Sequence, residues 1–132
     1  MKVFVAGTFD LFHVGHQYTL WTASKEGSEM VVVVARDATV ENIKSKKTVE
    51  NQEDRLERVK QEDLPNATVR LGREDADFAQ TLQEEQPDVI CLGYDQRCDE
   101  EWVLQILPNV QIKRMAPYHP QFFKSSLIAK QT

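Results

Sequence analysis

The sequence predicts a single α/β domain with a parallel sheet at its centre and helices flanking that sheet. Short apolar segments alternate with segments of helical periodicity along the 132 residues. This alternation implies right-handed crossovers between parallel strands. Residues 31–34 are four consecutive valines, a pattern typical of a strand that is buried on both faces of a parallel sheet. A hydrophobic content of 41% is enough to form the core that such a domain needs.

Five apolar segments are the predicted strands of this sheet. The first strand starts at Lys2 and ends before Gly7, and the second contains the four valines. The predicted strands cover residues 2–6, 29–35, 67–71, 88–92 and 110–115. Ligands of open parallel sheets bind beyond the carboxyl ends of the strands. The residues that follow each strand are therefore the ones expected to carry the chemistry.

Helices are predicted in the intervals between the strands. Apolar residues at i, i+4 and i+7 from Val14 predict the first helix, which Gly27 ends. Asn51 and Asp99 are suitable N-caps for two later helices. The helices predicted after the first cover residues 51–62, 75–86 and 99–108, and a short last helix follows Ser125. The longest irregular stretch, residues 43–50, is polar and rich in lysine, as expected of a functional lid.

The charge balance and the apolar pattern exclude several classes of partner. The sequence has 16 basic and 21 acidic residues and a net charge of −5. This balance argues against a nucleic-acid partner, because such binding needs a basic surface, although a cleft can hold the opposite sign to the whole molecule. No apolar run reaches the roughly 18 residues of a membrane span, so no membrane partner is expected.

The two cysteines and the first residues of the chain indicate the compartment. Cys91 and Cys98 make neither a disulfide framework nor a zinc site on their own. Cys91 lies in an apolar run and is interpreted as a small buried residue. The N-terminal residues lack the apolar stretch and cleavage site of a signal peptide. We therefore expect a cytoplasmic protein with reduced thiols.

The segment after the first strand carries the sharpest chemical pattern. It runs from Gly7 through Asp10 to His13, Gly15 and His16, where the first predicted helix opens. A helix start offers free backbone amides and a positive dipole end, which together favour a bound phosphate. The two histidines are three residues apart, so both rings can point the same way from the first turn. The glycines leave room for a ligand against the backbone.

This pattern indicates phosphoryl chemistry on a nucleoside triphosphate. It is neither the Gly-x-Gly-x-x-Gly dinucleotide fingerprint nor a lysine-bearing P-loop. Attack on an α-phosphate builds charge on the phosphoryl oxygens and on the departing pyrophosphate, and imidazole donors can stabilise that charge. Losing one such donor typically costs about 3 to 4 kcal/mol in the transition state. No nucleophilic side chain is required, because the phosphate oxygen of the acceptor attacks.

Two other interpretations of the histidine pair stay open from the residues alone. The pair can belong to an ordinary strand–turn–helix corner. It can also bind zinc, but the spacing lacks further ligands, and the third histidine, His119, is distant in sequence.

The segment Gly7-Thr8-Phe9-Asp10, followed by His13-Val-Gly-His16, resembles the signature of the HxGH nucleotidyltransferases. That superfamily includes cytidylyltransferases, pantetheine-phosphate adenylyltransferases and archaeal-type FAD synthases. Residues 31–37, 52–56 and 87–96 resemble the archaeal-type FAD synthases, which move AMP from ATP onto FMN. Their resemblance to glycerol-3-phosphate cytidylyltransferases is nearly as great. The implied fold is one Rossmann-like domain over residues 1–132, with a five-stranded parallel sheet in the order 3-2-1-4-5.

The resemblance also implies roles for particular residues. The implied catalytic residues are His13, His16 and Lys44. The implied nucleotide-binding residues are Gly7, Thr8, Phe9, Gly15, Lys46, Arg55, Gly93, Asp95, Ser125 and Ser126. Asp10 is implied to orient the acceptor. No protein-held metal is expected, and Mg²⁺ is expected to bridge phosphate oxygens with few protein ligands.

Several of these residues also have purely structural interpretations. Lys44 and Lys46 can belong to a solvated loop, and Arg55 can be a surface arginine paired with Glu53, Asp54 or Glu57. Asp95 can cap a turn, and Tyr94 is expected to pack rather than stack. Ser125 and Ser126 are good helix caps.

Two positions depart from the family patterns. Eight residues after Arg55 the chain has Asp63, where glycerol-3-phosphate cytidylyltransferases carry a second arginine. The Arg-x-x-Gly-x-Ser-Thr pattern of many members is missing before Ser125. The first departure favours the FAD synthase pattern.

We therefore predict a nucleotidyltransferase that joins a nucleoside triphosphate to a phosphorylated acceptor and releases pyrophosphate. ATP with FMN is the favoured pair, and CTP with glycerol 3-phosphate or another polyol phosphate is the alternative. A nucleotide-binding regulatory module without turnover and a structural subunit of flavodoxin-like shape are the competing classes. A homodimer is expected by analogy with the family.

Overall fold

The computed structural model describes residues 1–94 and 96–117, and a five-stranded parallel sheet forms its centre. The strands are β1 (Lys2–Gly7), β2 (Glu29–Val34), β3 (Ala67–Leu71), β4 (Val89–Leu92) and β5 (Gln111–Arg114). Their order is β3-β2-β1-β4-β5, which confirms the predicted fold class and strand order. All neighbouring strands are parallel, so their carboxyl ends lie at one edge of the sheet.

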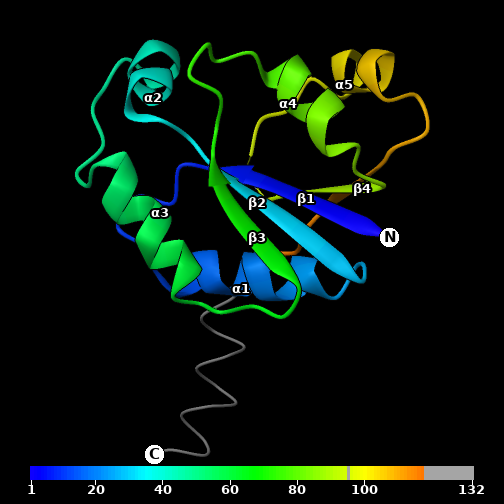
Figure 1. Ribbon diagram of the computed structural model, residues 1–132, viewed down its shortest axis with the longest axis horizontal. Coiled ribbons are helices and arrows are strands. Elements are labelled where there is room, and N and C mark those ends of the chain that lie inside the picture. Colours follow the sequence, from blue (N-terminus) through cyan, green and yellow to red (C-terminus); the bar gives the residue numbers. More distant parts are fainter. Residues whose placement is uncertain (95, 118–132) are drawn as a thin grey trace, which may run out of the picture.

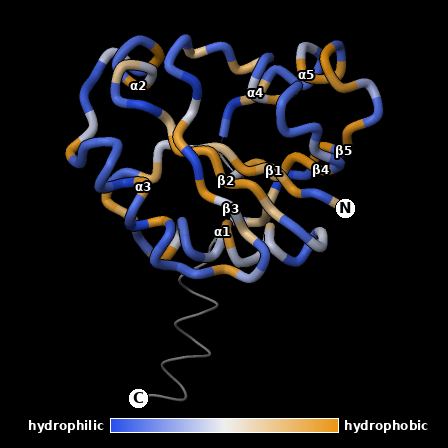
Figure 2. Tube along the Cα trace, viewed as in Figure 1, coloured by the Kyte–Doolittle hydropathy of each residue, from blue (hydrophilic) through white to orange (hydrophobic). Residues whose placement is uncertain are grey.

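Helices cover both faces of the sheet (Figure 1). Helices α1 (Val14–Ser24) and α3 (Gln52–Lys60) lie on one face, and α2 (Asp37–Lys44), α4 (Phe78–Glu85) and α5 (Glu100–Ile106) lie on the other. The four valines of β2 are at most 6% exposed, as predicted for a strand buried on both faces. Figure 2 shows the hydrophobic strands enclosed between more hydrophilic helices.

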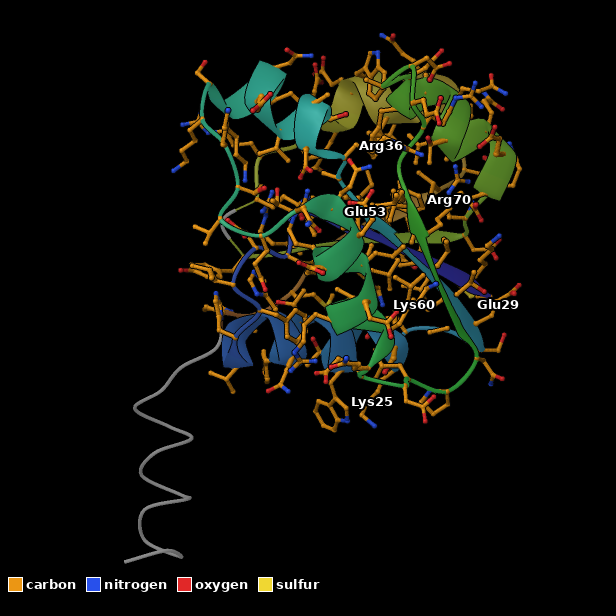
Figure 3. All side chains as sticks on the ribbon, turned by 60° about the vertical axis from the view of Figure 1, so that its left-hand side comes forward. Lys25, Glu29, Arg36, Glu53, Lys60 and Arg70 are labelled. Carbon is orange, nitrogen blue, oxygen red and sulfur yellow. The ribbon has the colours of Figure 1, made fainter. Side chains whose placement is uncertain are left out.

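Each face of the sheet has its own apolar core. On one face, Leu20 and Ala23 of α1 and Val59 of α3 pack against alternate residues of β1, β2 and β4. On the other face, Leu82 of α4 and Val103 of α5 pack against the intervening residues of the same strands. This alternation follows from the two-residue period of a strand. Charged side chains on the outside of this framework include Lys25, Glu29, Arg36, Glu53, Lys60 and Arg70 (Figure 3).

Helix α2 was not predicted from the sequence. This helix has only eight residues, and Val40 is the one that is buried, so few apolar positions mark it in the sequence. Its N-cap, Arg36, makes no side-chain cap hydrogen bond. Instead Gln52 Oε1 accepts from the amide of Asp37 at 2.9 Å. A tertiary contact therefore replaces the local start signal that sequence reasoning needs.

The other helices begin close to their predicted caps. Asn51 accepts from the amide of Asp54, and Asp99 accepts from the amide of Trp102, which confirms both predicted N-caps. Helix α4 starts at Phe78 and not near residue 75, because Asp77 is the residue that caps it. The helix predicted after Ser125 lies outside the described residues. Among the described helices, none has the length and apolar character to cross a membrane.

Candidate active site

The loop between β1 and α1 is held in an unusual backbone shape. Phe9 and Leu11 have φ values of 55° and 47°, in the left-handed region that such residues rarely adopt. The Phe9 ring is only 5% exposed. A Cβ atom on Gly7 would lie 3.0 Å from that ring. Because Gly7 has no side chain, the Phe9 ring can pack closely against it and stay buried. The backbone of the loop lies at the carboxyl edge of the sheet.

His13 and His16 cap the N-terminus of helix α1, each through its own Nδ1 atom. Nδ1 of His13 accepts from the amide of Gly15 at 3.0 Å, and Nδ1 of His16 accepts from the amide of His13 at 3.2 Å. An accepting Nδ1 carries no proton, so a neutral ring carries its proton on Nε2. Both imidazoles are thereby fixed as Nε2–H donors. Neither Nε2 makes a hydrogen bond within residues 1–94 and 96–117, so both donors are available to a ligand.

The two rings are stacked, with centroids 3.9 Å apart and planes inclined by 25°. Phe12 stacks on the other side of His16 at 5.3 Å, and Phe9 meets His16 edge-on at 5.6 Å. Burial, together with the neighbouring charge on His13, lowers the pKa of His16 to about 4, while Asp10 opposes the shift. His16 is therefore neutral at physiological pH, in the form that keeps Nδ1 free to accept.

The depressed pKa of His16 predicts a specific dependence of stability on pH. The unfolded chain binds a proton at this residue near pH 6.5, but the folded chain does so only near pH 4. Folding stability should therefore fall as the pH drops through this window. Thermal melting of the wild type and His16→Gln between pH 7 and pH 4 measures this. The wild type should lose more melting temperature over the window, and parallel curves would contradict the assignment.

Gly15 is needed for the position of the His13 ring. A Cβ atom at residue 15 would lie 2.8 Å from Cε1 and 3.0 Å from Nδ1 of His13. Gly15→Ala should displace this ring and reduce kcat about tenfold or more, since catalytic groups tolerate little misplacement. Gly72→Ala is the matched control, because its nearest neighbour would be 3.8 Å away. Equal kinetics for the two variants would refute this role.

The two lysines expected at the site differ in their contacts. Lys44 is the last residue of α2, and its Nζ donates to Oγ1 of Thr8 at 3.1 Å. Ser45 then adopts the left-handed conformation, with φ 56°, and ends the helix. Lys46 is exposed and makes no hydrogen bond or ion pair to the described residues. The structure therefore brings Lys44, but not Lys46, to the loop that carries the histidines.

Asp10 joins the β1–α1 loop to the lysine-rich segment, residues 43–50, through hydrogen bonds. Its two carboxylate oxygens accept from the amides of Val49 at 2.8 Å and Glu50 at 3.0 Å. A second link runs in the other direction, because Oε1 of Glu50 accepts from the amide of Leu11 at 2.8 Å. Burial tends to raise the pKa of Asp10, but the two amides and the charge of Arg55 lower it below its ordinary value. The acceptor-orienting role implied for Asp10 is thus joined by a structural role.

Arg55 is fully buried, with 0% exposure. Its guanidinium donates to the carbonyls of Thr8 (2.8 Å), Ala35 (2.7 Å) and Glu50 (3.1 Å) and to Oδ1 of Asp37 (2.6 Å). The interpretation as a surface arginine paired on its own helix is wrong. Arg55 ties three loops of the carboxyl edge together. The contact with the nucleotide phosphates or the acceptor that the resemblance implied for Arg55 stays a prediction.

Asp37 is the partner of Arg55 that sequence reasoning missed. Its Oδ1 accepts from Arg55 and Thr48, and its Oδ2 accepts from the amide of Gln52 at 3.2 Å. Burial would raise the pKa of this carboxyl, but the hydrogen bond and charge of Arg55 and the amide of Gln52 hold it below its ordinary value. Its position directly after the second predicted strand was the available signal, because aspartate at a strand end faces the ligand edge.

The remaining implied residues follow β4 or lie near the chain end. Gly93 donates its amide to Oε1 of Gln96 at 3.1 Å. Tyr94 is 56% exposed, so the expectation that it packs is wrong. Asp95, Ser125 and Ser126 lie outside the described residues.

The described residues contain no group of three or more histidine, cysteine, aspartate or glutamate side chains that could hold a metal ion. Among the described residues, the two Nε2–H groups and the Lys44 ammonium are donors that suit a phosphate anion.

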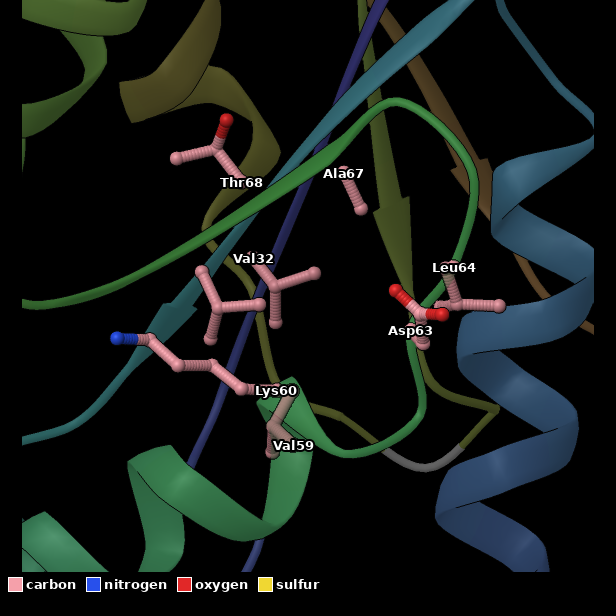
Figure 4. A pocket seen from close by; sticks show the side chains of 8 residues that line it. Val32, Val59, Lys60, Asp63, Leu64, Ala67 and Thr68 are labelled. Atoms are coloured by element: carbon pink, nitrogen blue, oxygen red, sulfur yellow. The ribbon is translucent and has the colours of Figure 1, made fainter.

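A separate hollow lies at the opposite edge of the sheet (Figure 4). Its walls come from the end of α3 and the start of β3, including Val59, Leu64, Ala67 and Val69. It therefore borders the amino end of β3, whereas the histidines lie beyond the carboxyl end of β1. Its lining is mainly apolar, and it contains none of the residues implied in phosphate binding.

The fold and this site define a nucleotide-binding α/β protein that presents two imidazole donors at the start of its first helix. The chain belongs to the Cytidylyltransferase-like family, whose model matches residues 4–131. This membership confirms the resemblance drawn from the HxGH signature.

Curated relatives and a solved structure are similar over nearly the whole chain. The FAD synthase of Thermoplasma acidophilum is 38% identical over 99% of this chain and 93% of its own length. The FAD synthase of Korarchaeum cryptofilum is 39% identical over 95% of this chain and 85% of its own. The crystal structure of a lipopolysaccharide core biosynthesis protein from Thermoplasma volcanium has a TM-score of 0.81 and 35% identity, covering 90% of this chain and 98% of that one.

Proposed function

We propose that this protein is an FAD synthase, a nucleotidyltransferase that moves AMP from ATP to FMN and releases pyrophosphate. The observation that carries the chemistry is the pair of stacked imidazoles, each fixed as an Nε2–H donor at the start of α1. The substrates come from the FAD synthases that are 38% and 39% identical to the chain.

The reaction needs no nucleophile from the protein. A phosphate oxygen of FMN attacks the α-phosphorus of ATP, a new P–O bond forms, and the bond to the β-phosphate oxygen breaks. Pyrophosphate leaves with the electron pair of that bond. A phosphate monoester is largely dianionic at pH 7, so the attacking oxygen needs no general base. Catalysis then depends on positioning and on charge stabilisation.

The proposed roles of the residues follow from their places at the carboxyl edge. His13 and His16 donate from Nε2 to the phosphoryl oxygens as charge builds in the transition state. Lys44 exchanges its hydrogen bond with Thr8 for the polyphosphate, and Lys46 adds a second cation. The backbones of Gly7, Phe9, Gly15 and Gly93 border the nucleotide. Ser125, Ser126 and Asp95 remain proposed nucleotide contacts.

Mg²⁺ is the proposed ion. It would supply charge neutralisation on the triphosphate and the pyrophosphate, held by phosphate oxygens and water. The protein's part is to receive that complex at a site whose own donors are positively charged or neutral.

A pyrophosphate-release assay tests the function. ATP and CTP are each combined with FMN, glycerol 3-phosphate, phosphopantetheine and a sugar phosphate, the last because a structural neighbour is named for lipopolysaccharide core biosynthesis. Release with ATP and FMN, and formation of FAD, is the expected result. Release only with CTP and a polyol phosphate would replace the substrates. A binding module without turnover would show nucleotide affinity and no release with any pair.

Three further properties are proposed, the last of them by analogy with the family. The chain forms one domain over residues 1–132, functions in the cytoplasm and assembles as a homodimer. Light scattering on the purified protein tests the assembly, and a monomer at micromolar concentration would reject it.

A further inference from the structure

The pairing of strands β1 and β4 ends before β1 reaches the carboxyl edge of the sheet. The pairing of β1 with β2 continues to Gly7 and Val34, but the pairing of β1 with β4 ends at Phe4 and Ile90. β1 is also the strand at which the order reverses, since β2 and β4 flank it and the chain proceeds outward in both directions. Such a switch point is where open α/β sheets bind ligands.

One side chain connects the segments that follow the last paired residues of β1 and β4. Nε2 of Gln96 donates to the carbonyl of Ala6 at 3.0 Å, and Oε1 of Gln96 accepts from the amide of Gly93 at 3.1 Å. The amide of Gln96 also donates to the carbonyl of Gly93 at 3.1 Å. A carboxamide is suited to this task because it offers a donor and an acceptor at once. Gln96 therefore links the end of β1 to the loop after β4.

Arg114, at the end of β5, holds the same loop from its other side. Its Nη1 donates to the carbonyls of Gly93 (2.8 Å), Gln96 (2.7 Å) and Tyr94 (3.3 Å). These bonds are exposed, whereas the bonds of the Gln96 side chain are partly buried. Water competes less with buried hydrogen bonds, so Gln96 should contribute more to the geometry than Arg114.

We propose that Gln96 is a positioning residue that sets the spacing between the end of β1 and the loop after β4 for binding the nucleoside part of the triphosphate. The loop after β4 is held by both Gln96 and Arg114, and of these two side chains Gln96 is the one that bonds to β1. The position of this loop relative to the end of β1 should therefore depend strongly on the Gln96 carboxamide. This inference rests on the proposed function only in taking a nucleoside triphosphate as the ligand.

Gln96→Glu tests the bridge with a substitution of nearly the same shape. The carboxylate can still accept from the amide of Gly93, but it places an oxygen against the carbonyl of Ala6 and repels it. The Kd for ATP and the KM for ATP should rise about tenfold or more, as expected when one partly buried hydrogen bond becomes a repulsive contact. The KM for FMN should change less than about twofold, a range within which no binding interaction is lost.

Two further variants separate positioning from folding. Gln96→Met removes donor and acceptor without adding charge and should raise the Kd for ATP by a smaller factor than Gln96→Glu. Gln105→Glu, on the exposed side of α5, is the matched control for the added charge and should leave the Kd unchanged. Melting temperatures of all variants are measured in parallel. Unchanged ATP affinity in a folded Gln96→Glu variant would overturn the proposal, as would equal increases in the KM for ATP and FMN.

The binding measurement uses ATP without any acceptor, so an incorrect acceptor does not affect it. If the wild type binds CTP and not ATP, the proposed function fails, and the same comparison with CTP still decides the role of Gln96.

Discussion

Replacing His13 with asparagine should abolish most of the turnover while leaving helix α1 intact. Asparagine is a preferred N-cap residue, so its side-chain oxygen can take over the hydrogen bond from the amide of Gly15. It lacks the Nε2–H donor that the imidazole presents. We expect kcat to fall by a factor of about 10² to 10³, the usual effect of removing one preorganised donor to a developing charge.

His13→Ala and the double variant with His16→Ala complete this test. His13→Ala removes both the donor and the cap, so it should lose the same activity and about 1 kcal/mol of stability as well. The double variant should lose less than the product of the single effects, because the stacked rings act on one phosphoryl group. Pyrophosphate release and urea unfolding are the measurements. Full activity in His13→Asn would show that the histidine only caps the helix.

The fold was predictable because its signals are local. Four consecutive valines identified a strand buried on both faces, and Asn51 and Asp99 identified two helix starts that the structure confirms. Alternation of strands and helices then fixed the parallel sheet. The position of the histidine pair followed in the same way, since it lies between a strand end and a helix start.

The supporting contacts of the site were not predictable, because they join residues that are far apart in sequence. Asp10 accepts from the amide of Val49, 39 residues away, and Arg55 reaches the carbonyl of Thr8 across 47 residues. No periodicity or cap signal encodes such pairs. An arginine on a polar helix has the same local pattern whether its guanidinium faces water or, as in Arg55, the interior.

Replacing Arg55 with methionine should have the largest effect on stability of any single substitution at the site. The guanidinium is fully buried and ion-paired with Asp37 at 2.6 Å. Its removal takes one donor from each of three carbonyls and the cation from Asp37, although Thr48 still donates to the carbonyl of Glu50 and to Asp37. Breaking a fully buried pair costs about 3–5 kcal/mol, and because the Asp37 side chain is 40% exposed and partly solvated, we expect a loss near the lower end, about 3 kcal/mol. This is a large part of the roughly 5–15 kcal/mol that stabilises a domain. Urea unfolding measures the loss.

Arg58→Met is the matched control, one turn further along α3. Arg58 is 35% exposed, and its ion pair with Glu62 joins residues one helical turn apart. Helical pairs with this spacing contribute about 0.3–0.5 kcal/mol, and the contact of the Arg58 guanidinium with the Phe12 ring, 4.5 Å from its centroid, adds about 0.5–1 kcal/mol. A loss in Arg55→Met no larger than in Arg58→Met would show that Arg55 does not brace the loops. Arg55→Lys keeps the charge but has fewer donors in a different geometry, so it should recover only part of the stability.

The pH dependence of these variants separates the charge of Arg55 from its hydrogen bonds to carbonyls. In the wild type, burial would raise the pKa of Asp37, but Arg55 holds it below its ordinary value, so stability is lost as the pH falls through the folded pKa. In Arg55→Met the carboxylate keeps the burial and loses the cation, so its pKa should rise. Protonation of Asp37 then removes the carboxylate charge that has lost its cation in the variant. The difference in unfolding free energy between the variant and the wild type should therefore shrink as the pH is lowered. The part that persists when Asp37 is protonated is the contribution of the loop carbonyls, and a difference independent of pH would assign the whole effect to them.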